Sequence, residues 1–147
     1  MAVRKFIFIV VSSLILGNAA SAQTLPFSPV VEANGVIYLA GHLGRDPETK
    51  KFPKGIKAET KQTLVNIGAT LKTVNAGYAD IVRCQVFLDN IKDFSQMNEV
   101  YKTFFPENPP ARTTVAVEKL ALNAKIEIEC TAVRGHGARL GAEPREQ

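Results

Sequence analysis

The chain is 147 residues long, carries a formal net charge of +4 and contains 46% hydrophobic residues. This length is typical of one domain, and so mild a charge, without a dense basic run, argues against a nucleic-acid partner. The two histidines and two cysteines form no C-x-x-C motif and show no spacing typical of metal ligands. We therefore expect a single domain that binds neither nucleic acid nor metal.

The first 22 residues have the pattern of a secretory signal peptide. Arg4 and Lys5 precede an apolar run over residues 6–16, and a small-residue motif of the A-x-A type ends at Ala22. The run is shorter than the about 20 apolar residues that cross a membrane, so an uncleaved anchor is the less favoured alternative. Cleavage after Ala22 leaves 125 residues (147 minus 22) with a net charge of +2 (4 minus 2). We expect a periplasmic or secreted protein with no stable membrane association after cleavage.

The residues that follow predict a β-hairpin, a loop and a helix. Asn34 and Gly35 separate two apolar runs within SPVVEANGVIYLAG, and both residue types favour the positive φ angles of a tight turn. Residues 44–57 are polar and contain two prolines and two glycines, which is typical of a loop. From 58 to 75, apolar residues recur at spacings of three and four, which predicts an amphipathic helix.

A second helix and two strands complete the predicted elements. A helix is predicted to begin near Asp93, because its apolar stripe contains Phe94, Met97, Tyr101 and Phe104. The prolines that follow it lead into a strand at 113–117. Residues 125–133 alternate as the last strand. The tail 135–147 is Gly-rich, polar and non-periodic, which predicts disorder.

The two cysteines lie on buried faces of predicted strands. In the strand 81–88, Val82 and Cys84 share the apolar face, and Cys130 lies on the apolar face of the last strand. We interpret both cysteines as buried free thiols that behave as small hydrophobes. A disulfide is the alternative, since exported proteins meet oxidising conditions.

The order of the elements predicts the fold class. Two amphipathic helices among strands bury their apolar stripes most economically on one face of a single sheet, which is an α+β architecture. The other face mixes polar residues such as Arg83 and Glu129 with apolar Phe87. Such a mixture predicts burial against another subunit, and we expect a small homo-oligomer.

Arg112 and Glu127 lie on the last two predicted strands, which we expect to be neighbours in the sheet, and are candidates for chemistry. An arginine pairs a carboxylate through a planar fork, and a positioned carboxylate activates water as a general base. From the residues alone, the alternatives are an ion-pairing surface arginine and an exposed strand carboxylate. Strand alternation also places Glu129 on the face of Glu127, and nothing local says which of the two matters.

Several stretches together resemble the RidA/YjgF family of reactive-intermediate deaminases. The resemblance covers roughly residues 26–134, which assigns 23–134 to one RidA-like domain. Its most specific part is the final PPAR…V…L…KIEIE block. The stretches are IYLAGHLGRDPETKKF, GYADIVRCQVFLDN, DFSQMNEVYKTFF, PPARTTVAV and LALNAKIEIECTAV.

The resemblance implies a chorismate-mutase-like fold, with a single mixed sheet and two helices on one face. It implies a homotrimer with active sites in clefts between subunits and no cofactor. It also implies hydrolysis of 2-aminoacrylate-type imino acids to 2-oxo acids and ammonia, so that the small-molecule partner is an imino acid or a carboxylate.

The family's site residues carry over one by one. Arg112, after P-P-A, matches the family's clamp for the substrate carboxylate. Glu127, the first glutamate of K-I-E-I-E, matches the residue that orients the attacking water. Asn98 of the second helix matches an asparagine that borders the pocket.

Three parts of the site depart from the family pattern. The family often has Ser-Gly-Gln where this chain has Ala40, Gly41 and His42, and His42 is either a pocket residue or a surface loop residue. A tyrosine commonly occupies the position of Phe27. A cysteine commonly occupies that of Thr114, whose backbone groups are expected to orient the substrate nitrogen. Because this chain lacks the Ser and Tyr hydroxyls that are common in the family, the resemblance does not specify its range of substrates or its rate of turnover.

Two other functions compete with deamination. The first is a non-catalytic trimeric module that binds small carboxylates in the same cleft, which the Ala40 and Phe27 substitutions favour. The second is a holdase-like or ribonuclease activity, and the mild charge and export signal argue against ribonuclease. Glu127 favours catalysis, because a second negative charge adds nothing to a pocket that merely binds carboxylates.

Overall fold

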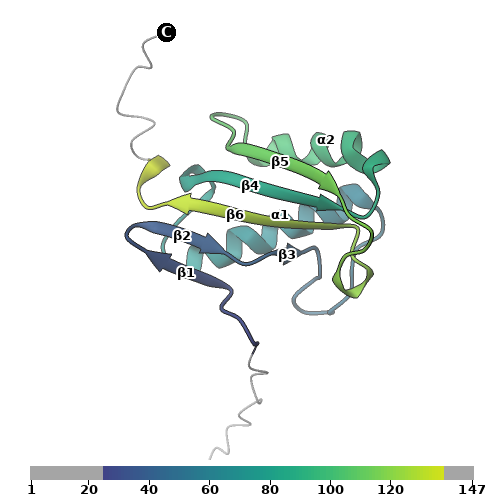
Figure 1. Ribbon diagram of the computed structural model, residues 1–147, viewed down its shortest axis with the longest axis horizontal. Helices are drawn as coiled ribbons and strands as arrows, with labels where there is room; N and C mark the ends of the chain where they lie inside the picture. The colour runs from purple at the N-terminus through teal and green to yellow at the C-terminus, as the bar shows by residue number, and fades with distance from the viewer. Residues whose placement is uncertain (1–24, 138–147) are drawn as a thin grey trace, which may run out of the picture.

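The computed structural model describes residues 25–137 as a single sheet with helices on one side (Figure 1). The predicted signal peptide and the cleavage point after Ala22 lie outside these residues. The strands are β1 (Val30–Ala33), β2 (Val36–Leu39), β3 (His42–Leu43), β4 (Ile81–Leu88), β5 (Ala111–Ala116) and β6 (Ile126–Val133). The helices are α1 (Ile56–Thr73) and α2 (Phe94–Phe104), with short 3-10 turns η1 (Tyr78–Asp80), η2 (Ile91–Asp93) and η3 (Ala121–Asn123).

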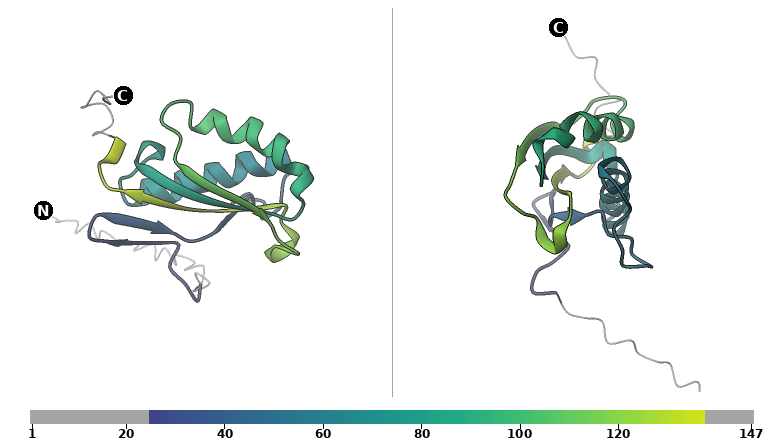
Figure 2. Two further views of the ribbon diagram at one scale, coloured as in Figure 1. Left: turned by 45° about the horizontal axis from the view of Figure 1, so that its top comes forward. Right: turned by 90° about the vertical axis from the view of Figure 1, so that its right-hand side faces the viewer.

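The strands form one mixed sheet in the order β1-β2-β6-β4-β5, and β3 also pairs with β6. The pair β4 and β5 is parallel, and the other pairs are antiparallel. Both helices cover the same face of the sheet (Figure 2). The predicted α+β class and the placement of the helices are therefore confirmed. No helix within residues 25–137 is long and apolar enough to cross a membrane.

The first hairpin forms as its turn residues predict. Asn34 (φ 52°) and Gly35 (φ 77°) both take positive φ angles between β1 and β2. Asparagine and glycine tolerate this region of backbone space, and such turns match the twist of paired strands. The hairpin brings β2 against β6, so that Tyr38 lies opposite Thr131 on the uncovered face of the sheet.

The core lies between the sheet and the two helices. Alternate side chains of β6, from Ile126 to Ala132, are buried, and the side chains between them are half-buried on the opposite face. Leu64, Ile67 and Leu71 of α1 are fully buried against this layer. Burial of apolar area of this kind stabilises a fold by about 25 cal/mol per Å².

Strand β4 differs from the predicted alternation at its start. Val82 was expected on the buried face, but Ile81 is buried there and Val82 is half-buried. Ile81 pairs with Ala132 and Arg83 with Thr131, so the register against β6 shifts at Val82. One extra residue reverses the side-chain alternation on one side of a bulge, which explains the difference.

Cys84 and Cys130 form a disulfide, so the interpretation as two free thiols is wrong. Both cysteines are buried, as expected, with exposed fractions of 0% and 1%. The register of β4 and β6 places them directly opposite each other, with Cα atoms 4.1 Å apart. The strand pairing, which a single strand's pattern does not reveal, is what brings the two sulfur atoms together.

Glu59 of α1 is a buried carboxylate, 2% exposed, that holds the start of β6. The backbone N–H of Lys125 donates to Glu59 Oε1 at 2.6 Å. Burial raises the pKa of Glu59, and the N–H groups of Lys125 and Ile126 oppose that shift. The helix layer thus fixes the strand that carries Glu127 two residues after this contact.

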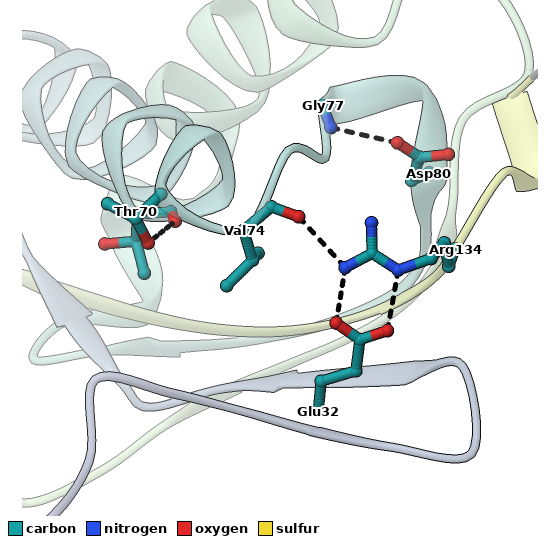
Figure 3. Close-up of polar contacts among 7 residues, drawn as sticks. Glu32, Thr70, Val74, Gly77, Asp80 and Arg134 are labelled. Atoms are coloured by element: carbon teal, nitrogen blue, oxygen red, sulfur yellow. Dashed lines mark hydrogen bonds and ion pairs between the residues drawn. The ribbon is translucent and has the colours of Figure 1, made fainter.

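Arg134 fastens the far end of β6 to β1 and α1 (Figure 3). Its guanidinium pairs with the carboxylate of Glu32 on β1 and donates to the Val74 carbonyl at 2.9 Å, just beyond α1. The tail was predicted to be disordered from residue 135, but the N–H of Gly137 donates to Asp80 Oδ1 at 3.2 Å. The rest of the tail, 138–147, lies outside the described residues.

Candidate active site

Arg112 lies on the edge strand β5 and faces the helices. It pairs with Cys84 of β4, whose side chain is in the core, and directly paired residues project from the same face of a sheet. The Arg112 Cζ atom lies 4.5 Å from the centre of the Tyr101 ring and 5.8 Å from that of the Phe94 ring. Arg112 is therefore held between β5 and α2 by aromatic side chains.

A pocket of about 490 Å³ opens beside this arginine, between α2 and the residues that lead into β5. It is lined by Asn98, Tyr101, Lys102, Phe105, Pro109, Pro110 and Arg112. The lining contains two cations and no carboxylate. The structure thus brings the predicted pair of Arg112 and Asn98 into one pocket, and the charge of this pocket suits an anionic ligand.

The guanidinium of Arg112 has no anionic partner among residues 25–137, where it lies near two aromatic rings. Arginine stacks on an aromatic face while its N–H groups, which lie in the guanidinium plane, stay available to a carboxylate. The geometry of Arg112 therefore suits a clamp for a ligand carboxylate.

Glu127 projects from the other face of the sheet. It pairs with Phe87 of β4, which is three residues from Cys84 and so points away from the core. Its carboxylate packs against Gly41, where even one added methyl carbon would collide with it. Partial burial raises the pKa of Glu127, and the neighbouring charge of Glu129 raises it further.

The expectation that Arg112 and Glu127 lie on neighbouring strands is wrong. β4 lies between β5 and β6, and the two side chains leave the sheet on opposite faces. Chain order does not give strand order, because β5 returns beside β4 in parallel after α2. Within one chain, these two side chains do not share a pocket.

The other predicted site residues lie in different parts of the chain. Gly41 lies beside Glu127, whereas Thr114 follows Arg112 on the helix-facing side of β5. Phe27 precedes β1 and is 55% exposed. Ala40 is half-buried after β2, and its carbonyl oxygen accepts a hydrogen bond from His42.

His42 has a structural role in this protomer. Its Nδ1 donates to the Ala40 carbonyl at 2.7 Å, and its Nε2 lies 2.8 Å from the Thr70 hydroxyl of α1. Burial lowers the pKa of His42, while the bond to Ala40 partly opposes this shift. Both ring nitrogens are thus engaged inside the protein.

No group of three or more metal-ligating side chains occurs in the part of the chain that the structure describes.

Sequence reasoning missed the two aromatic residues that hold Arg112. Phe94 and Tyr101 were assigned to the apolar stripe of the second helix, which is sufficient to explain them. The spacing of Phe94, Asn98 and Tyr101, at four and three residues, places all three on one helix face. That spacing was the available signal, but it gains meaning only when β5 is known to lie against this face.

Comparison with known families gives a match to the model described as endoribonuclease L-PSP over residues 17–134. The chain belongs to this family. It is the RidA/YjgF family that the sequence motifs resemble, and its members include proteins named as deaminases of reactive intermediates.

Among similar proteins is the chloroplastic Reactive Intermediate Deaminase A of Arabidopsis thaliana, 43% identical over 114 residues. The match covers 77% of this chain and 61% of that longer relative. The 2-iminobutanoate/2-iminopropanoate deaminase of Bos taurus is 38% identical over 126 residues, covering 85% of this chain and 92% of the relative.

Solved structures of the family have the same fold. RidA from an Antarctic Psychrobacter matches with a TM-score of 0.72 and 33% identity, covering 76% of this chain and 91% of that one. E. coli TdcF with bound serine matches with a TM-score of 0.72 and 30% identity, covering 76% and 90%. The expected chorismate-mutase-like fold is thereby confirmed.

Proposed function

We propose that this protein hydrolyses reactive imino acids of the 2-aminoacrylate type to 2-oxo acids and ammonia. The observation that carries the proposal is Arg112, a guanidinium held by aromatic rings in a pocket without carboxylates. The names of relatives such as the bovine 2-iminobutanoate/2-iminopropanoate deaminase support the same reaction. Serine bound to E. coli TdcF, a relative of the same fold, is consistent with a ligand that carries a carboxylate next to nitrogen.

The reaction needs few groups from the protein. Arg112 pairs with the substrate carboxylate through two parallel N–H···O bonds, while Asn98 borders the ligand. Glu127 takes a proton from water as the water oxygen bonds to the imine carbon, and the nitrogen, which receives the electron pair of the C=N bond, is protonated by solvent. Glu127 then returns its proton to the amino group of the resulting aminoalcohol, so that ammonia leaves as the C–N bond breaks, while the hydroxyl proton passes to solvent and the carbonyl of the 2-oxo acid forms. Backbone groups at Thr114 orient the nitrogen, so the position tolerates Thr in place of Cys.

The proposed site is completed between subunits of a homotrimer. Arg112 and Glu127 leave opposite faces of one protomer's sheet, so a cleft that holds both takes them from two copies. The uncovered face offers apolar surface for such contact, because Tyr38 is 51% exposed and Val115 42% exposed. Gly41 accompanies Glu127 in this arrangement, and we place Ala40 and Phe27 at the same cleft.

We also propose that the protein acts in the periplasm or outside the cell, after cleavage following Ala22. The Cys84–Cys130 disulfide supports this, because such bonds persist mainly in oxidising compartments. The substrate would then come from an exported enzyme that oxidises amino acids or amines to imines. No cofactor is needed for the hydrolysis.

A carboxylate-binding module without catalysis is the second candidate. The exposed Phe27 and the small Ala40 favour it, because both lack the hydroxyl that is common in the family. Such a protein retains the Arg112 pocket and binds 2-oxo acids without accelerating any reaction.

The deciding experiment measures imine decay. An amino-acid oxidase generates imino acids in place, and a semicarbazide trap reports the imine that survives, with the protein present or absent. We expect wild type to speed imine loss, Glu127→Gln to abolish the acceleration while retaining 2-oxo acid binding, and Arg112→Ala to weaken that binding. Glu129→Gln is the matched control, since it removes a carboxylate from the same strand face. Binding without acceleration by wild type across a broad set of imines favours the module instead.

A further inference from the structure

The Arg112 guanidinium lies over the ring of Tyr101. Tyr101 is 5% exposed and packs against Phe105 with 4.8 Å between ring centres. The Cζ atom of Arg112 lies 4.5 Å from the centre of the Tyr101 ring. Phe94, about two turns of α2 earlier and 40% exposed, lies 5.8 Å from the same atom. The guanidinium therefore has one buried and one peripheral aromatic neighbour.

Other partners for Arg112 are missing from the described chain. No carboxylate there pairs with its guanidinium, and the residues that line its pocket include none. An arginine side chain has several rotatable bonds, and an unrestrained one loses entropy when it binds a ligand. An acidic partner would restrain Arg112 but would also compete with a ligand carboxylate, whereas an aromatic face restrains it without occupying its N–H groups.

We propose that Tyr101 is a positioning residue for carboxylate recognition, whose ring face holds the Arg112 guanidinium with its N–H edge open to the ligand. This inference rests on the proposed function in taking Arg112 as the clamp for the substrate carboxylate. It adds a residue that acts through Arg112 and touches neither the imine carbon nor the attacking water.

The ring, and not the hydroxyl, performs this role. The Tyr101 hydroxyl is buried and has no hydrogen-bond partner within residues 25–137. Burial raises the pKa of Tyr101 to about 12, against an opposing effect of Arg112, so the hydroxyl stays neutral at physiological pH. A buried hydroxyl that lacks a partner contributes nothing that phenylalanine would lose. Phenylalanine should therefore substitute for Tyr101, and an aliphatic residue should not.

The test measures ligand binding and turnover in Tyr101→Phe and Tyr101→Leu. The binding probe is 2-oxobutanoate, with its uncharged methyl ester as the matched control ligand. We expect Tyr101→Phe to bind 2-oxobutanoate within about twofold of wild type and Tyr101→Leu to bind it about tenfold more weakly, the range of a desolvated cation–π contact. Binding of the ester should change little, so the preference for the acid over the ester falls. In turnover, KM should rise in Tyr101→Leu more than kcat falls.

A double-mutant cycle separates positioning from general damage to the fold. In an Arg112→Ala background, Tyr101→Leu should have no further effect on the Kd of 2-oxobutanoate, because the guanidinium that it positions is gone. Melting temperatures report folding, and Tyr101→Met, which is also non-aromatic, replaces Tyr101→Leu if the latter does not fold. Equal loss of acid and ester binding, or an undiminished effect in the Arg112→Ala background, would overturn the proposal.

The outcomes also distinguish this inference from the proposed function. A wild type that binds 2-oxobutanoate but hydrolyses no imine defeats the deaminase proposal and leaves the binding data to decide on Tyr101. Imine hydrolysis that is unchanged in KM by Tyr101→Leu defeats the Tyr101 proposal alone. If wild type binds no 2-oxo acid, the Tyr101 proposal also fails, because Arg112 then does not bind a ligand carboxylate.

Discussion

The surroundings of the Glu127 carboxyl group raise its pKa. Partial burial is the larger cause of its raised pKa, and the negative charge of Glu129 on the same strand face adds to it. A general base works only when it is ionised, and the best catalytic pKa lies near the working pH. In the proposed base role, a raised pKa makes Glu127 a stronger base at the cost of activity in acid.

This placement predicts how activity depends on pH. As the pH falls, kcat/KM should decline through the raised pKa of Glu127, above the usual range for glutamate. Glu129→Gln removes a like charge, which lowers the pKa of Glu127 and should move this acid limb to lower pH. The measurement is kcat/KM against pH for wild type and Glu129→Gln. An acid limb that stays in place or moves upward in the variant contradicts a base role for Glu127.

The sequence revealed the site residues unevenly. Arg112 and Asn98 were found through a family motif, and the structure places both in one pocket. Tyr101 was missed because a buried aromatic residue in an apolar stripe needs no second explanation. His42 remained ambiguous because its bond to Thr70 spans 28 positions along the chain, and no local pattern predicts a contact of that kind.

At the scale of elements, the disulfide joins the two central strands of the sheet. Cys84 of β4 and Cys130 of β6 are 46 positions apart in the sequence, and their bond closes the intervening chain into a loop. Closing a loop of this length removes conformational freedom from the unfolded chain, which stabilises the fold by about 4 kcal/mol in the chain-entropy treatment. Both sulfur atoms are buried, so reduction is expected to require transient unfolding.

Reduction should therefore lower stability while the fold persists. Protein unfolded and refolded in dithiothreitol should melt ~10 °C or more below the oxidised protein, given the usual relation between free energy and Tm for a domain of this size. The control is Cys84→Ala/Cys130→Ala, whose Tm should be the same with and without reductant. Equal melting of oxidised and reduced wild type would mean that the bond contributes no stability.

Elements with a strong local pattern were predicted well, and those set by pairing were not. The first hairpin and the strand Ile81–Leu88 match their expected positions. β3 is two residues long and forms only because His42 and Leu43 meet β6, so its residues carry no periodic signal. The bulge at Val82 likewise depends on the register against a strand some 50 positions away.

At the scale of the molecule, the separation of Arg112 and Glu127 matters most. The sequence places them 15 positions apart on successive strands, and this spacing predicts that both side chains belong to one site. The parallel return of β5 instead puts β4 between them and sends their side chains to opposite faces. Since a symmetric oligomer repeats each surface, a neighbouring copy can supply the missing partner to every site.

Mixed oligomers can test the proposed homotrimer, in which each site draws on two subunits. We expect Arg112→Ala and Glu127→Gln to be inactive when pure. Refolding them together in equal amounts should restore about a quarter of wild-type activity, because one neighbour pairing in four joins an intact Arg112 to an intact Glu127. The measurement is imine decay by the refolded mixture, with sedimentation to establish that trimers have formed.

The control is a mixture of Arg112→Ala with the double variant Arg112→Ala/Glu127→Gln, which contains no intact arginine and should stay inactive. If both groups instead acted within one protomer, every site in the first mixture would carry one defect, and no activity would return. Sedimentation showing monomers at micromolar concentration would contradict a shared site more directly. Restored activity would assign Arg112 and Glu127 to adjacent copies, and so explain how one protomer can hold them on opposite faces and still form an active site.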